Sequence, residues 1–284
     1  MSKYQNRGSL VYQIKNELDK KLAIGTSRHD LKKIDKNAAY EKITSWGSYK
    51  NIMQKSNVFA RFCKDNYGCK TLDDCRPYVN VFLASHENAH TAKGYANALG
   101  NLYSVPSTDF IKTPERTAPT KGREQSKRDA SVDREANKDL IDFVRGSGLR
   151  RHELENLKTG KIDFKDGQPY VVVEGGKGGK PRIAPILGTP EQQNAIVAKI
   201  EGNPGQEKVW EQVHTKLNVQ SLRRNYCQNL YRQYARDLSQ LHYKEKYFCR
   251  GENVGKVYDK AALKICSEAL GHNRLDVVVN NYFR

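Results

Sequence analysis

A proline-interrupted basic segment divides this chain of 284 residues into two periodic halves. From residue 104 to residue 131, apolar residues no longer recur at helical or strand spacing, and Pro106, Pro114 and Pro119 interrupt the segment. Its basic side chains are Lys112, Arg116, Lys121, Arg123, Lys127 and Arg128. This composition is typical of an interdomain linker. We therefore expect two domains, residues 1–103 and 131–284, joined by a linker over residues 104–130.

Apolar residues at helical spacing predict four helices before the linker. They fall at about residues 11–22, 48–62, 77–83 and 91–102. Pro77 is suited to the first turn of the third helix, where its missing N–H costs nothing, and Thr91 is predicted to cap the fourth. The first half should therefore be a small four-helix domain.

The second half changes period twice. A helix is predicted from Ser131, with Asp133 in its first turn, to the break at Gly146–Gly148, and another from Leu149. Three short strands follow at residues 162–164, 170–173 and 182–186, the last two joined by a glycine-rich hairpin turn at 175–179. Helices are then expected after Thr189, at about 219–238 and at about 259–271, whereas 241–258 is expected to be loop or irregular strand. The predicted fold class is mainly α with a small antiparallel β-sheet.

The C-terminal stretch CSEALGHNRLDVVVNNYFR combines a helix end with a late tyrosine. Gly271 suits the left-handed conformation that follows many helices, and His272 stands at that corner. Asn273 is predicted to cap a last helix, whose apolar face consists of Leu275, Val278 and Val279. Tyr282 lies near its end. A tyrosine hydroxyl can serve as a nucleophile where cationic and hydrogen-bonding groups surround it.

The charge balance points to a polyanionic partner. Lys and Arg total 49 against 32 Asp and Glu, a formal net charge of +17. Nucleic acid is the usual partner of so basic a protein, and a merely cationic surface is the alternative. The basic linker is either solvated or follows a phosphate backbone, where contacts add affinity without sequence information.

Several other classes of protein are not supported by the sequence. It shows no secretory segment and no bilayer-spanning apolar run, so we expect a soluble, cytoplasmic protein. The six cysteines form no CxxC or CxxH pair, which makes a zinc site unlikely, and no phosphate-binding GxxxxGK[ST] loop is present. We expect neither a cofactor nor a metal ion.

Four motifs precede the terminal tyrosine: GLRRHEL at 148–154, the hairpin lysine Lys177, QSLRRNY at 220–226 and LGH at 270–272. Together with Tyr282 they resemble the tyrosine recombinase (phage integrase) family over the whole second domain. The resemblance implies that Arg150 and Arg223 bind the scissile phosphate and that His272 donates a further hydrogen bond to it. It also implies that Lys177 is the general acid and that Tyr282 is the nucleophile.

This resemblance implies a site-specific recombinase or integrase that cleaves and rejoins DNA through a 3′-phosphotyrosyl intermediate. Integration, excision or resolution of a mobile element would be its task. The first domain would be the core-binding domain, which forms a clamp around DNA with the catalytic domain. The expected partners are double-stranded recombination sites, three further copies of the chain in a tetramer on DNA (with a monomer when free), and accessory DNA-bending proteins. The protein would be associated with the nucleoid when bound to DNA.

The sequence departs from the family pattern at several positions. Gln220 stands where a histidine usually begins the His-x-x-Arg motif, and an amide cannot shuttle a proton near neutral pH. His214 is an alternative base. Arg151 and Arg224 are rivals of Arg150 and Arg223, while Glu153 is expected to orient its neighbours.

Two further departures lie at the end of the chain. The spacing from His272 to Tyr282 is about one residue longer than in the family. The chain also ends two residues after Tyr282, which leaves open how subunits would be coupled. Two other functions remain: a DNA-binding relative with weakened catalysis, which Gln220 and the shifted tyrosine favour, and strand nicking and closing of the kind that type IB topoisomerases perform with a similar site.

Overall fold

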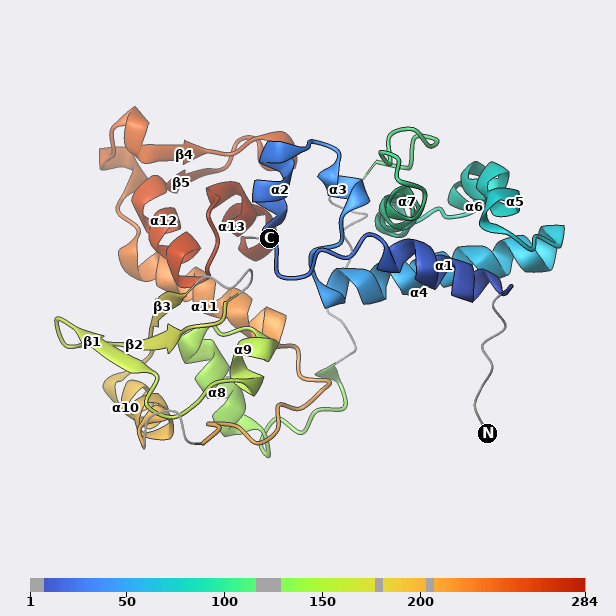
Figure 1. Cartoon of the computed structure of the whole chain (residues 1–284). Coiled ribbons are helices and arrows are strands. Elements are labelled where there is room, and N and C mark those ends of the chain that lie inside the picture. Colours follow the sequence, from blue (N-terminus) through green and yellow to red (C-terminus); the bar gives the residue numbers. More distant parts are fainter. Residues whose placement is uncertain (1–7, 116–128, 177–180, 203–206, 284) are drawn as a thin grey trace. The chain divides into compact units, whose positions relative to one another are not determined.

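A computed structural model describes residues 8–115, 129–176, 181–202 and 207–283 (Figure 1). The chain separates into two compact units, residues 1–122 (unit 1) and residues 123–284 (unit 2). The division falls within the predicted linker. The assignment of the units as core-binding and catalytic domains, with the boundaries predicted from the sequence, remains a prediction.

Unit 1 is helical throughout its regular structure. Its elements are α1 (Leu10–Asp19), α2 (Arg28–Ile34), α3 (Ala38–Glu41), α4 (Trp46–Tyr67), α5 (Leu72–Cys75), the 3₁₀ turn η1 (Arg76–Tyr78), α6 (Val79–Ala84) and α7 (Ala89–Tyr103). The expectation of four helices is therefore too low, because α2, α3 and α5 are short and lack a long apolar stripe. The fourth predicted helix is capped by Asn88 rather than Thr91: Asn88 Oδ1 accepts from the backbone N–H groups of His90 and Thr91.

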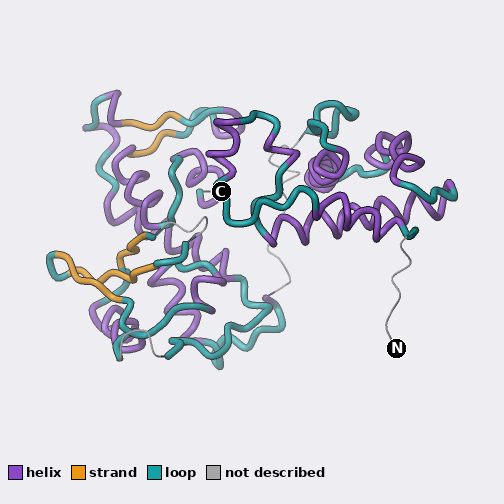
Figure 2. The backbone as a smooth tube through the Cα atoms, in the orientation of Figure 1, coloured by secondary structure: helices purple, strands orange, loops and turns teal. Residues whose placement is uncertain are grey.

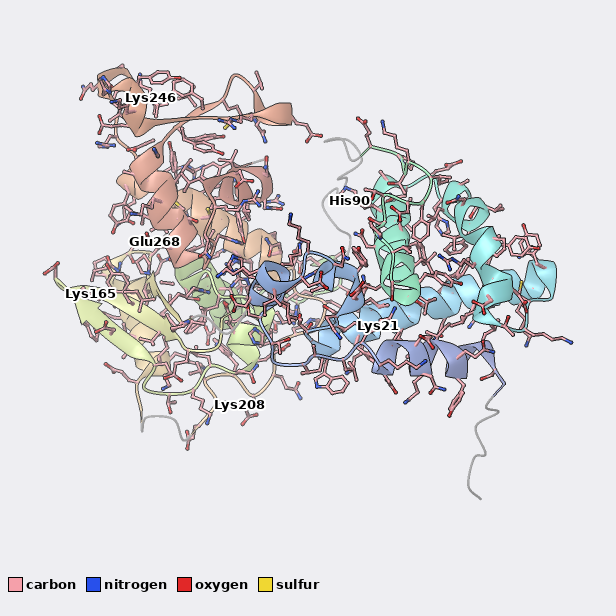
Figure 3. All side chains as sticks on the ribbon, turned by 45° about the horizontal axis from the view of Figure 1, so that its top comes forward. Lys21, His90, Lys165, Lys208, Lys246 and Glu268 are labelled. Carbon is pink, nitrogen blue, oxygen red and sulfur yellow. The ribbon has the colours of Figure 1, made fainter. Side chains whose placement is uncertain are left out.

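A buried lysine ties the first helix of unit 1 to the last. Lys21 follows α1, is only 8% exposed, and donates through Nζ to the carbonyls of Asn101 and Leu102 in the last turn of α7 (Figure 3). Burial lowers the pKa of Lys21. The carbonyls at a helix C-terminus lack intrahelical partners and carry partial negative charge, so they suit a cation. This contact fixes the end of α7 against α1.

Unit 2 combines helices with two small sheets. Its elements are α8 (Lys138–Ser147), α9 (Arg151–Glu155), β1 (Ile162–Lys165), β2 (Gln168–Val173), β3 (Arg182–Pro185), α10 (Pro190–Ile200), α11 (Val219–Tyr234), η4 (Leu238–Gln240), η5 (Tyr243–Glu245), β4 (Lys246–Phe248), η6 (Gly251–Asn253), β5 (Val257–Asp259), α12 (Lys260–Ala269) and α13 (Leu275–Tyr282). The predicted fold class, mainly α with a small antiparallel sheet, is confirmed. The clamp remains a prediction.

The first sheet has the order β1-β2-β3 and is antiparallel throughout (Figure 2). Its register pairs Ile162 with Val171 and Val171 with Ala184. Along β2 the side chains alternate between buried and half-buried, as expected for a strand with one face on a core. The glycine-rich turn expected at 175–179 lies largely outside the described residues, and so does Lys177.

Helix α11 lies between two hydrophobic clusters of unit 2. Leu222 belongs to the cluster built around α8 and β2, whereas Tyr226 and Leu230 belong to the cluster around α12 and α13. Gly148 ends α8 with a φ of 62°, and a Cβ there would lie 2.3 Å from the Tyr226 ring. Glycine is therefore required at this position for both conformation and space. The end of α8 is therefore packed closely against the Tyr226 ring of α11, and the Gly148 carbonyl accepts from Arg223 of the same helix.

Three sequence expectations about element boundaries in unit 2 are wrong. Helix α8 begins at Lys138 rather than near Ser131, because Asp133 Oδ1 accepts from two following backbone N–H groups and forms a turn. Helix α11 ends at Tyr234, after which the N–H of Arg236 donates to Asp259. The last helix begins after an extended Arg274, one residue later than the Asn273 cap predicts.

The segment 241–258, expected to be loop or irregular strand, forms the antiparallel pair β4–β5 in its second part. All six cysteines are buried and free. Of the described residues, none belongs to a helix long and apolar enough to cross a membrane.

Candidate active site

The Tyr282 hydroxyl is held by two cationic or titratable side chains from distant segments. Arg223 Nε donates to the phenol oxygen at 3.0 Å, and His272 Nε2 lies 3.2 Å from the same oxygen. The Tyr282 side chain is nearly buried, at 3% exposed, and Arg223 is fully buried. The hydroxyl of Tyr282, in the last turn of α13, therefore lies inside a polar cluster and is not presented to solvent.

The corner between α12 and α13 brings His272 to this position. Gly271 has a φ of 64°, the left-handed conformation predicted from the sequence, and a Cβ there would lie 2.8 Å from Arg182 Cδ. The carbonyl of Leu270, at the end of α12, accepts from Arg223 at 2.5 Å and from Arg150 at 2.8 Å. The carbonyls at a helix C-terminus carry the negative end of the helix dipole, so the Leu270 carbonyl is a favourable partner for the positively charged side chains of Arg150 and Arg223.

Glu153 is the common partner of the arginines. Its Oε1 accepts from Arg150 at 2.8 Å, and its Oε2 accepts from Arg182 at 2.6 Å and from the backbone N–H of Arg150 at 2.7 Å. Arg223 lies 3.9 Å from the same carboxylate. Burial opposes ionisation of Glu153, but Arg182 and the N–H of Arg150 together hold its pKa below the ordinary value. Glu153 therefore orients its neighbours, as expected from the sequence.

This cluster carries more positive than negative charge. Three guanidiniums, of Arg150, Arg182 and Arg223, surround one carboxylate, and their side chains are 20%, 6% and 0% exposed. Burial lowers the pKa of Arg223, and it lowers the pKa of Arg182 to about 10, which leaves the Arg182 guanidinium charged at neutral pH. A buried excess of cationic charge is costly unless an anion compensates it. The arrangement therefore suits a phosphate group.

Four of the predicted site residues meet in this cluster: Arg150, Arg223, His272 and Tyr282. Lys177 lies outside the described residues. Gln220 lies in the first turn of α11, exposed, one helical turn before Arg223.

The rival residues lie elsewhere. Arg151 donates to the backbone carbonyls of Val213, His214 and Leu217, and so fixes a loop. His214 Nδ1 accepts from the backbone N–H of Lys216 in the same loop. Of the two adjacent pairs of arginines, Arg150 and Arg223 share the carbonyl of Leu270, and Arg223 also donates to the Tyr282 hydroxyl.

Arg182 is the residue that sequence reasoning missed. The sequence predicts only that Arg182 begins a strand, yet its side chain joins Glu153 to the carbonyl of Ala269, to which NH1 donates at 2.7 Å. Its Nε is buried without a hydrogen-bond partner among the described residues. A basic residue at the start of an otherwise apolar strand is the one signal that the sequence offered.

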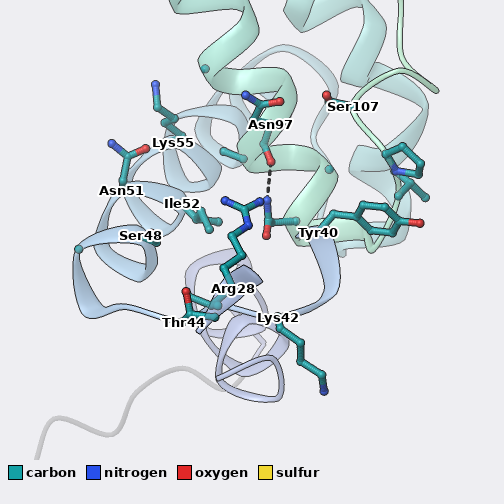
Figure 4. Close-up of a pocket in the computed structure, with 18 of the residues that line it drawn as sticks. Arg28, Tyr40, Lys42, Thr44, Ser48, Asn51, Ile52, Lys55, Asn97 and Ser107 are labelled. Carbon is teal, nitrogen blue, oxygen red and sulfur yellow. Dashed lines mark hydrogen bonds between the residues drawn. The ribbon is translucent and has the colours of Figure 1, made fainter. Parts of the chain in front are cut away.

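A second polar region lies in unit 1. A groove of about 640 Å³ is bounded by α2, α3, α4 and α7, and Figure 4 shows Arg28, Asn51 and Asn97 around the same space. Its described lining residues include the basic side chains Arg28, Lys42 and Lys55 and no carboxylate. Guanidinium and ammonium groups suit phosphates, and amides can contact base edges. This groove, called the unit 1 groove below, is therefore a candidate surface for a polyanion.

No protein-family model matches the chain. Two curated relatives are similar to parts of it. The tyrosine recombinase XerA of Thermococcus kodakarensis is 38% identical over 127 residues, which cover 38% of this chain and 44% of the relative. The tyrosine recombinase XerA of Pyrococcus horikoshii is 35% identical over 79 residues, 28% of this chain and 27% of the relative. The matches thus span less than half of each curated relative, and the predicted resemblance to tyrosine recombinases is confirmed.

Solved structures of recombinases also align with the chain. The XerH site-specific recombinase bound to its difH substrate is 15% identical, with a TM-score of 0.45, over 99% of this chain and 88% of that chain. The Tn1549 transposon integrase in complex with transposon right-end DNA is 12% identical, with a TM-score of 0.45, over 96% and 94% of the two chains.

Proposed function

We propose that this chain is a tyrosine recombinase that cleaves and rejoins DNA strands through a 3′-phosphotyrosyl bond to Tyr282, and so integrates, excises or resolves a mobile element. The observation that carries the proposal is the position of the Tyr282 hydroxyl, 3.0 Å from Arg223 Nε, inside a buried cluster with excess cationic charge. The similarity to the two XerA recombinases supports it independently.

In this mechanism, Tyr282 attacks the phosphorus of a phosphodiester. The bond from the phenol oxygen to phosphorus forms and the bond to the 5′ oxygen breaks. Arg150 and Arg223 stabilise the charge that develops on the non-bridging oxygens, since guanidiniums offer paired donors and stay charged. Preorganised donors of this kind are usually the largest catalytic contribution, about 3–4 kcal/mol each in other systems. Lys177 would protonate the leaving 5′ oxygen, as the family resemblance implies.

The phenolic proton needs an acceptor. Gln220 cannot take it, because an amide does not bind a proton near neutral pH. His272 Nε2 lies 3.2 Å from the phenol oxygen, and an imidazole nitrogen, unlike an amide, is able to bind a proton. We therefore assign His272 a double role: it accepts the proton of Tyr282 and then, as imidazolium, donates to the phosphate. The reaction conserves the phosphodiester bond energy in the covalent link, so rejoining needs no ATP.

DNA binding would involve both units. The unit 1 groove offers cations and amides without opposing carboxylates, as duplex DNA requires. Recombination of two sites would need four protomers, and accessory DNA-bending proteins would set its direction; both follow from the family resemblance. The chain would be associated with the nucleoid when bound to DNA.

A covalent-adduct assay tests the proposal. The protein is first allowed to select its site from a random pool of duplexes, and the selected sequence is then built into a nicked suicide substrate. We expect a covalent protein–DNA adduct on a denaturing gel, also in the presence of EDTA. Tyr282→Phe should abolish the adduct and leave the dissociation constant for DNA within about twofold, because it removes one oxygen only. Tyr243→Phe, an exposed tyrosine of the same unit, is the matched control.

Each other outcome has a clear meaning. An adduct that persists in Tyr282→Phe contradicts the assignment of the nucleophile. Tight, site-selective binding by wild type without any adduct supports the DNA-binding relative with weakened catalysis. Relaxation of a plasmid that lacks the selected site supports strand nicking and closing of the topoisomerase kind.

A further inference from the structure

The pair of strands β4–β5 is a feature that the proposed function does not use. In chain order it comes between α11, which carries Arg223, and α12, and its register pairs Tyr247 with Tyr258 and Phe248 with Val257. Figure 1 shows the pair next to α12. Lys246, at its first position, is labelled in Figure 3. We call residues 246–259 the β4–β5 hairpin.

One contact of the hairpin reaches the residue that follows the tyrosine. Phe283 packs edge-on against Tyr258 of β5, with ring centroids 5.1 Å apart, and against Tyr231 of α11, also at 5.1 Å. Tyr231 and Tyr258 contact each other at 5.6 Å. Edge-to-face aromatic pairs stabilise beyond their buried area. Phe283, Tyr231 and Tyr258 therefore form a closed set of three rings, and Phe283 is one peptide bond from Tyr282.

A second contact reaches the last turn of α13. Asn253, in the turn of the hairpin, donates through Nδ2 to Asn280 Oδ1 at 2.8 Å. The carbonyl of Tyr282 itself accepts from Gln228 of α11 at 2.9 Å. The β4–β5 hairpin and α11 thus each form a hydrogen bond with the C-terminal end of α13.

Helix α13 needs such contacts. It has eight residues, and its N-cap Arg274 makes no side-chain capping bond. Helices this short are unstable without tertiary packing. The hairpin, in contrast, is firmly attached to its own unit: buried Asp259 binds the Arg236 guanidinium at 2.9 Å, its backbone N–H donates to the Tyr231 hydroxyl, and Cys249 is buried. The hairpin can therefore serve as a rigid support for a weak helix.

We propose that the β4–β5 hairpin is a positioning element for the nucleophile: through Tyr258 and Asn253 it fixes the end of α13, and thereby holds the Tyr282 hydroxyl at Arg223 and His272. The proposal rests on the proposed function. Tyr258 and Asn253 touch neither DNA nor the reacting atoms in this mechanism. They act through the backbone of α13, because a nucleophile displaced by about 1 Å can lose roughly 100-fold in rate.

Single-turnover cleavage of the suicide substrate, with protein in excess over DNA, tests this role. We expect Tyr258→Ala to lower the cleavage rate roughly 10- to 100-fold, with the dissociation constant for DNA changed less than about twofold. Tyr258→Phe keeps the ring and should cleave at nearly the wild-type rate. Tyr243→Ala, which removes a 70% exposed ring stacked on Phe248, is the control for general damage to the region and should also cleave normally. Wild-type cleavage by Tyr258→Ala would overturn the proposal.

Asn253→Ala provides a milder variant in case Tyr258→Ala does not fold. In a double-mutant cycle with Asn280→Ala, the effects on the cleavage rate should be non-additive, because both changes remove the same hydrogen bond. Strictly additive effects would contradict the proposed contact.

Hydrogen exchange of the backbone amides of residues 275–283 provides a readout that does not depend on catalysis. Exchange there should be faster in Tyr258→Ala and Asn253→Ala than in wild type, and unchanged in Tyr243→Ala. If wild type forms no adduct but α13 is released in these variants, the proposed function fails and the support of α13 stands. If exchange is unchanged, the hairpin does not support α13, whatever the activity.

Discussion

Arg223 and Tyr282, which are 59 positions apart, meet through a 3.0 Å hydrogen bond from guanidinium Nε to phenol oxygen. The remaining nitrogens of the same guanidinium donate to the carbonyls of Gly148 and Leu270. One buried side chain thus connects the end of α8, the end of α12 and the last turn of α13. All three nitrogens of its planar guanidinium donate to these partners, an arrangement that a lysine, with a single nitrogen, could not replace.

Glu153 should be essential to the stability of unit 2. Glu153→Gln preserves size but leaves three neighbouring arginines without a carboxylate, and breaking a buried ion pair in this way costs about 3 kcal/mol or more. Urea denaturation at pH 7 measures the loss. The exposed pair Lys264–Glu268 provides the control, since Glu268→Gln should change stability by less than about 1 kcal/mol. Equal effects of the two changes would show that the arginine cluster does not depend on Glu153.

The same carboxylate should produce a dependence of stability on pH. The pKa of Glu153 is lower in the folded protein than its ordinary value of about 4.3, which applies in the unfolded chain. The stabilisation of the folded state by the ionised Glu153 carboxylate is therefore complete at pH values above about 4.3. It is lost as the pH falls through the folded pKa. The difference in unfolding free energy between wild type and Glu153→Gln should therefore shrink as the pH falls below about 4. A constant difference from pH 7 to pH 3 would contradict this.

Arg182 should act as a positioning residue for the corner that carries His272. Arg182→Met keeps the length of the apolar stem but removes the bonds to Glu153 and to the carbonyl of Ala269. We expect the cleavage rate to fall at least tenfold, since the preorganised donors around the phosphate are no longer aligned. DNA affinity should change far less. Arg182→Lys restores the charge without the fork of donors and should recover only part of the rate; full recovery would show that charge alone is needed.

Gln220→His should raise the cleavage rate if proton transfer from Tyr282 limits it. Position 220 lies one turn before Arg223 on α11, so an imidazole there is close to the cluster. The pH–rate profile tests whether His272 is the base that accepts the Tyr282 proton in wild type. If His272 is the base in wild type, the rate should rise with pH through an ionisation of that side chain. His272→Gln should remove that ionisation, and a profile unchanged by His272→Gln would exclude it as the base.

The unit 1 groove should contribute phosphate contacts. Lys42→Ala and Arg28→Ala should each weaken binding for all sequences alike and reduce the slope of log K against log salt by about one. Lys64, which is exposed on α4 but does not line the groove, is the matched control. Equal slopes for all variants would place the DNA on another surface.

Local signals in the sequence determined much of this protein. Gly148 and Gly271 were recognisable because each ends a helix, and Thr189-Pro190 because capping patterns are short-range. Strands were predicted at 162–164, 170–173 and 182–186 and lie at 162–165, 168–173 and 182–185. The motifs around Arg150, Arg223, His272 and Tyr282 named the four side chains that meet at the candidate site, although their catalytic roles remain predictions.

Only the tertiary structure decided which side chains share a partner. Arg182 binds Glu153 across 29 positions and the carbonyl of Ala269 across 87, and no pattern within one segment encodes such contacts. The segment 241–258 was predicted only as loop or irregular strand, because the two strands of the β4–β5 hairpin have three residues each, and Tyr258 packs against Tyr231 of α11 and Phe283 at the end of the chain. A sequence specifies its helices through short-range capping and periodicity, whereas a buried charge cluster depends on the packing of all its segments at once.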